Sequence, residues 1–98
     1  MKGLLLTAII SITGTAALSQ QVSCAPAFHI MMRLDSRYQE TIQDARDQDG
    51  VILEMWANPE NGTWTFTARD DSGAMCILTH GKDYHGQTVT DIMLGTSI

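Results

Sequence analysis

The sequence predicts a small α+β domain in which one short N-terminal helix packs on a three- to four-stranded antiparallel β-meander, stapled by one disulfide. Three features predict this fold: an amphipathic helical pattern after Pro26, a series of strand-like segments separated by turn residues, and a single pair of cysteines. A helix with one apolar side and a sheet with one apolar face can bury these surfaces against each other. That packing gives a two-layer α+β architecture.

The predicted helix runs over residues 26–38. Pro26 suits the first helical position because its missing N–H would have no partner there. Apolar side chains recur at positions 27, 30, 31, 34 and 38, which places them on one side of a helix. His29, Arg33 and Arg37 then fall on the more solvated side.

The segments that follow predict strands over residues 40–47, 51–57, 63–69 and 74–80. Asp49-Gly50 before a β-branched apolar run is a strong hairpin signal. A hairpin needs a preceding strand, which only the first of these segments can supply, although Ile42 and Ala45 would also fit an extension of the helix. The connectors between the later strands are short, so neighbouring strands should be antiparallel.

The strand at 63–69 has one apolar and one polar face. Trp64 and Phe66 alternate with the threonines at positions 63, 65 and 67, which is typical of a sheet with one buried side. We therefore expect Trp64 and Phe66 to form core contacts with the helix rather than a platform for a ligand.

The other face of the sheet is predicted to be open and to carry a binding patch of Trp56, Glu54 and Thr65. Positions 51, 53 and 55 form the better core set by composition. Trp56 would then join Glu54 on the open face, beside the threonines of the next strand. An exposed tryptophan with an acidic rim is a plausible anchor for a protein partner.

Residues 1–19 have the layout of a secretory signal peptide. Lys2 is followed by an apolar core over positions 4–12 and then by small residues, which predicts cleavage after Ser19, with Ala17 as the alternative. A membrane anchor fits less well, because a spanning helix needs about 20 apolar residues. A lipid anchor on Cys24 is a further alternative, since small residues precede that cysteine.

Residues 20–81 are predicted to form the single domain of a periplasmic or secreted protein. A core of this size is marginally stable by itself, and small exported domains often add a disulfide. The two cysteines, Cys24 and Cys76, are therefore expected to be bonded. If Cys76 faces the helix layer, this bond would pin the helix to the sheet.

Residues 82–98 are predicted to be a C-terminal tail, as a short edge strand over 88–94 or as a frayed end. His80, Asp83 and His85 lie close together in sequence near its start. Their spacing fits one face of neither a helix nor a strand, so a surface loop is the favoured interpretation. A small exported metal-binding protein or enzyme using these three residues is the alternative functional hypothesis.

Charge and motifs argue against several classes of function. After removal of the signal, five basic side chains face eleven acidic ones, without the basic patch that a nucleic acid or an anionic membrane would need. Ser72 lacks the glycine elbow of a hydrolase nucleophile, and no cofactor motif is present. The leading hypothesis is a small non-enzymatic interaction protein, periplasmic or secreted, with a basic protein as partner.

Several segments together resemble a group of small exported proteins of unknown function from alphaproteobacteria and their phages. The segments are Cys24-Ala25-Pro26, residues 37–41, residues 54–58, Gly62-Thr63-Trp64-Thr65, and Cys76 with Gly81 behind it. The resemblance covers about 60 of the 98 residues. It implies export, a disulfide and this fold, and it implies no catalytic residue. This sequence departs from the group at Gln39, where the group has glycine.

Overall fold

The computed structural model describes residues 22–95. Its elements are β2 (Ser23–Pro26), α1 (Ala27–Tyr38), β3 (Thr41–Gln48), β4 (Val51–Ala57), β5 (Trp64–Arg69), β6 (Ala74–Gly81) and α2 (Val89–Leu94). The predicted signal peptide at 1–19 lies outside the described residues. Within the described range, no helix has both the length and the apolar character needed to cross a bilayer.

The strands form one five-stranded antiparallel sheet in the order β2-β6-β5-β4-β3. The α+β class and the four-strand meander are confirmed, and each predicted strand agrees with the structure to within one residue at either end. The strand count and the N-terminal position of the helix are wrong, because β2 precedes α1. Four residues ending in Pro26 carry no alternating pattern, and proline is tolerated here because β2 is an edge strand.

The hairpin between β3 and β4 turns at Asp49 and Gly50. Both residues have positive φ, 54° and 90°, as the favoured two-residue hairpin turn requires. The backbone N–H of Gly50 also donates to the Asp47 carboxylate at 3.0 Å. This turn sets the register from Gln48 opposite Val51 to Asp44 opposite Met55, and an irregularity at Gln43 then shifts the register so that Ile42 lies opposite Trp56.

Helix α1 ends at Gln39, whose backbone is left-handed with φ 51° and ψ 40°. Its N–H donates to the Asp35 carbonyl at 3.1 Å, and the N–H of Glu40 donates to the Leu34 carbonyl at 2.9 Å. A left-handed conformation favours glycine, so Gln39 adopts here a backbone that a glycine would adopt with less strain. The left-handed turn at Gln39 ends the helix and brings Glu40 next to its last turn.

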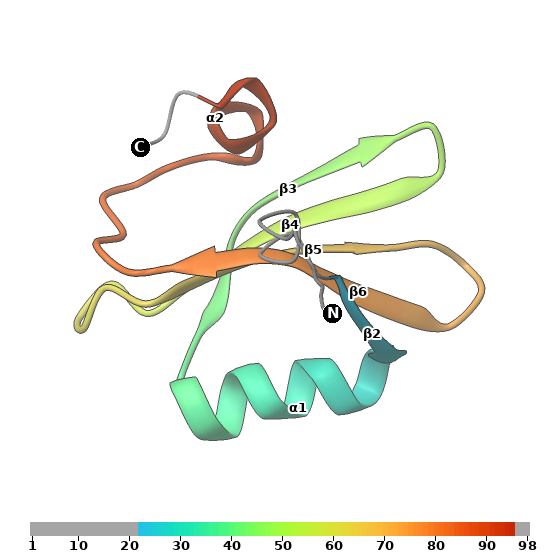
Figure 1. The fold of residues 1–98 in the computed structure, drawn as a ribbon, viewed down its shortest axis with the longest axis horizontal. Coiled ribbons are helices and arrows are strands. Elements are labelled where there is room, and N and C mark those ends of the chain that lie inside the picture. The colour runs from blue at the N-terminus through green and yellow to red at the C-terminus, as the bar shows by residue number, and fades with distance from the viewer. Residues whose placement is uncertain (1–21, 96–98) are drawn as a thin grey trace, which may run out of the picture.

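Helix α1 covers one face of the sheet (Figure 1). Ile30 and Leu34 of the helix pack against Trp56 and Met75 of the strands, and all four side chains are buried. Trp56 therefore faces α1, and the prediction that it lies on an exposed face is wrong.

Helix α2 lies on the opposite side of the sheet (Figure 1). Its Val89 packs with Leu53, Met55 and Phe66 in a second buried cluster, and Trp64 lies against that cluster. Phe66 is a core residue as predicted, and the half-buried Trp64 packs against the same cluster, but neither faces α1. The alternation correctly grouped Leu53 with Met55 and Phe66, yet it could not show which face α1 covers.

Residues 88–94 form neither an edge strand nor a frayed end. Thr88 accepts a hydrogen bond from the Asp91 N–H at 3.1 Å, and its own N–H donates to the Asp91 carboxylate at 3.0 Å, which is a capping box. The Val89 N–H donates to Asp44 of β3 at 2.8 Å. The predicted domain end at residue 81 is therefore too early, since the core extends to α2.

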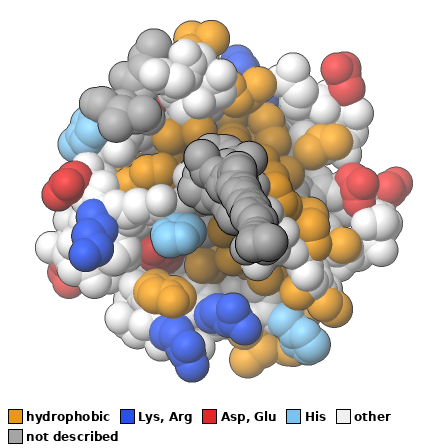
Figure 2. Space-filling view, viewed as in Figure 1, with side chains coloured by type: hydrophobic (Ala, Val, Ile, Leu, Met, Phe, Trp, Pro, Cys, Tyr) orange, Lys and Arg blue, Asp and Glu red, His pale blue; other side chains and the backbone are white. Residues whose placement is uncertain are grey.

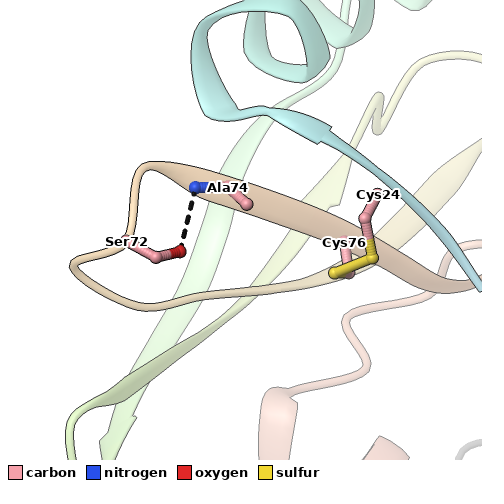
Figure 3. Close-up of a disulfide and its surroundings, with 4 residues drawn as sticks. All are labelled: Cys24, Ser72, Ala74 and Cys76. Carbon is pink, nitrogen blue, oxygen red and sulfur yellow. Dashed lines mark hydrogen bonds between the residues drawn. A yellow bond between two sulfur atoms is a disulfide. The ribbon is translucent and has the colours of Figure 1, made fainter.

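The disulfide joins Cys24 of β2 to Cys76 of β6, which lie directly opposite each other with Cα atoms 4.0 Å apart (Figure 3). The predicted pairing is confirmed, but the condition under which the bond would pin the helix, that Cys76 faces α1, is not met. Ala25 and Met75, the adjacent pair in the register, pack in the cluster under α1. Because successive side chains alternate between faces, the cysteines point away from α1, and the bond links two strands instead of the helix and the sheet.

Candidate functional site: a cleft beside the end of helix α1

A cleft of about 650 Å³ lies between the second half of α1 and strands β5 and β6. Its charged and polar lining includes Arg33, Tyr38, Glu40, Thr65, His80 and Lys82. Leu34, Ile77 and Leu78 contribute apolar wall. The cleft thus combines an apolar lining with a few ionisable groups, as ligand sites commonly do.

Glu40 is the most unusual group in this cleft. Its side chain is only 2% exposed, and its Oε1 atom has no hydrogen-bond partner in the structure. Buried polar atoms are normally hydrogen-bonded, and an unsatisfied one costs about 1–3 kcal/mol, with more for a charged group. The backbone N–H of Glu40 donates to the Leu34 carbonyl, which holds the backbone of Glu40 at the end of α1.

The basic side chains of the cleft lie at its exposed rim. Arg33 and Lys82 are solvent-exposed, as is His80. Neither Arg33 nor Lys82 forms an ion pair with a described residue. Figure 2 shows hydrophobic side chains gathered in the middle of the view, with basic side chains below them on the side where α1 lies. The charge of the cleft is therefore divided, negative at its buried carboxylate and positive at its rim.

Two of the three predicted binding residues are buried and cannot form an exposed patch. Trp56 is 5% exposed and donates from Nε1 to the Thr67 hydroxyl at 3.1 Å. Glu54 is 2% exposed and accepts two hydrogen bonds from Arg69, at 3.2 and 3.1 Å. The hydrogen bond to Glu54 and the charge of Glu54 raise the pKa of Arg69. These contacts explain why an acid can lie next to Trp56 under a helix.

Thr65, the third predicted residue, lies opposite Trp56 in the β4–β5 register. Its residue surface is 5% exposed, and it lines the cleft. Thr65 therefore belongs to a candidate site, although the cleft is covered on one side by α1 and is not the open sheet face that the sequence predicted.

His80, Asp83 and His85 are not brought together as a metal site. His80 is on β6 and lines the cleft, while His85 lies in the following loop with its Nδ1 atom 2.9 Å from the Asp83 backbone carbonyl. Across residues 22–95, no group of three His, Cys, Asp or Glu side chains is placed to hold a metal ion. No observation therefore favours the metal-binding alternative.

Glu40 is the site residue that sequence reasoning missed. The sequence presents it only as the first residue of the predicted strand over 40–47. No sequence signal marks it, because counting back from the Asp49-Gly50 turn would place Gln43 opposite Trp56. The register shifts between Ile42 and Asp44, so Ile42 lies opposite Trp56 instead. Glu40, two residues before Ile42, then points to the same face as Trp56, where it is buried.

Comparison with protein-family models, curated proteins and solved structures finds no significant match to the chain.

Proposed function

We propose that this chain is a small exported, non-enzymatic binding protein whose cleft receives a basic group of a protein partner. The observation that carries the proposal is the buried carboxylate of Glu40, which lines the cleft with an unpartnered oxygen. An ammonium or guanidinium group would supply the missing donors and neutralise the buried charge. Such charge-assisted hydrogen bonds are among the stronger ones in proteins.

A basic side chain suits this site better than a metal ion. One carboxylate, without further carboxylate, imidazole or thiolate ligands grouped around it, offers too few donors for a metal among the residues described. A protonated amine needs only a few acceptors, and the Thr65 hydroxyl lies in the same cleft.

The disulfide supports an oxidising compartment for this chain, and its net charge supports a basic partner. Disulfides persist mainly in oxidising compartments, which supports a periplasmic or secreted location for a chain that contains the Cys24–Cys76 bond. The acidic excess, with eleven Asp or Glu against six Lys or Arg in the full sequence, would attract a basic protein and speed its approach.

The proposal is tested with Glu40→Gln, which keeps the size of the side chain and removes its charge. The probe is the peptide acetyl-Gly-Gly-Lys-amide, whose only charge is its lysine ammonium, titrated into protein expressed from the full sequence and purified after export. We expect saturable binding by calorimetry, weakened about tenfold or more in the variant, as for a hydrogen bond to a charged group worth about 1.5–3 kcal/mol. Glu60→Gln is the matched control, because Glu60 is an exposed acid outside the cleft.

Thermal unfolding of the free proteins gives a second readout. Replacing an unpaired buried carboxylate with a neutral amide should leave the melting temperature unchanged or higher, the usual sign of a site kept for function at the cost of stability. Equal weakening by Glu40→Gln and Glu60→Gln, or an absence of saturable binding to the parent protein, would contradict the proposal.

A further inference from the structure

We infer that the group seated in the cleft is zwitterionic: a C-terminal lysine residue, with its side-chain ammonium at Glu40 and its main-chain carboxylate at Arg33 and Lys82. This inference rests on the proposed function and adds the chemical class of the ligand.

The basic side chains at the rim of the cleft favour a ligand that carries a carboxylate. Arg33 and Lys82 line the same cleft as Glu40, and neither is paired with a described acidic side chain. A purely cationic segment would bring its positive charge against both of them. A ligand with a carboxylate next to its basic group turns that repulsion into attraction, and the planar guanidinium of Arg33 suits a carboxylate because it can donate two parallel hydrogen bonds.

The apolar wall of the cleft favours a ligand with a chain of methylene groups. Leu34, Ile77 and Leu78 line the cleft together with these charged groups. The four-carbon stem of a lysine can lie along apolar surface while its charged end reaches a polar partner. A ligand with two opposite charges separated by methylene groups therefore matches the composition of the cleft, with acid, apolar wall and basic rim in one site.

The buried carboxylate distinguishes this cleft from an ordinary surface groove. Glu40 is only 2% exposed, and its Oε1 atom has no hydrogen-bond partner in the structure. A structural carboxylate at such a depth would be expected to have its acceptors satisfied. The rim alone would suit any anion, so it is Glu40 that requires the ligand to carry a positive charge as well.

The test compares four probes by calorimetry on the exported full-sequence protein. These are acetyl-Gly-Gly-Lys with a free carboxylate, the same peptide with a C-terminal amide, acetyl-Gly-Gly-norleucine with a free carboxylate, and free lysine. We expect the first peptide to bind at least tenfold more tightly than the amide and than the norleucine peptide. Arg33→Gln should remove the preference for the free carboxylate, while Arg37→Gln, an exposed arginine of α1 outside the cleft lining, should keep it.

The outcomes separate the inference from the proposed function. Equal binding of the free acid and the amide overturns the zwitterion and leaves the basic-group site standing. Equal binding of the lysine and norleucine peptides overturns both, because Glu40 would then recognise no cation. Free lysine binding as tightly as the lysine peptide keeps the zwitterion but overturns a protein C-terminus as its source. Loss of the carboxylate preference in Arg37→Gln as well as in Arg33→Gln overturns the assignment to the rim.

Discussion

At the scale of single residues, Trp56 changes from a predicted surface anchor to a core residue. It is buried against Ile30, Leu34 and Met75, with its indole N–H bonded to Thr67. Trp56→Ala should lower the free energy of unfolding by about 3–5 kcal/mol. A domain of this size has a net stability of roughly 0.05–0.15 kcal/mol per residue, so much of the variant should be unfolded. Urea unfolding followed by circular dichroism measures the loss.

Val51→Ala provides the control for this prediction, because Val51 is on the same strand and is exposed. It should shift the urea midpoint only slightly. A Trp56→Ala variant as stable as the Val51→Ala variant would contradict the position of Trp56 under α1.

At the scale of the elements, helix α2 depends on its cap. A six-residue helix is too short to be stable without packing, and its Thr88–Asp91 capping box and the bond from Val89 to Asp44 hold it on the sheet. Thr88→Ala should cost about 1 kcal/mol. Because the loss is local, amide hydrogen exchange should quicken over residues 89–94 before it quickens in β4 and β5.

Thr90→Ala is the matched control for the cap. Thr90 is within α2 but outside the capping box, and alanine favours helix formation more than threonine does. Exchange over 89–94 should therefore be unchanged or slower in Thr90→Ala. Equal protection of these amides in the parent protein and in Thr88→Ala would show that the cap does not hold the helix.

At the scale of the whole molecule, the disulfide closes a long loop. Cys24 and Cys76 are 52 positions apart in sequence, and on the entropic model such a cross-link stabilises a fold by roughly 4 kcal/mol. The mass of the purified protein should be lower than that of its reduced form by two hydrogen atoms. Reduction should lower the urea midpoint strongly, and a double Cys24→Ala/Cys76→Ala variant should behave like the reduced protein. Free thiols in the exported material, or an unchanged midpoint on reduction, would contradict this prediction.

The sequence by itself determined the order and bounds of α1 and of strands β3 to β6, and the partners in the disulfide. These features depend on local chemistry. Asp49-Gly50 supplies the two positive φ angles of a hairpin turn, and the alternation of Trp64 and Phe66 with threonines sets which residues share a face. Two cysteines leave one intramolecular pairing.

Only the tertiary structure decided which layer covers each face. A period of two separates the faces of a strand but does not say which one a helix will bury, and five consecutive residues of β4, Leu53 to Ala57, are buried because α1 and α2 cover opposite sides. The tertiary structure also decided the pairing of β2 with β6, because β2 is too short for an alternating pattern. It decided the burial of Glu40 as well. Its burial depends on the left-handed turn at Gln39 and on the packing of α1 above it, which are long-range consequences that no local pattern carries.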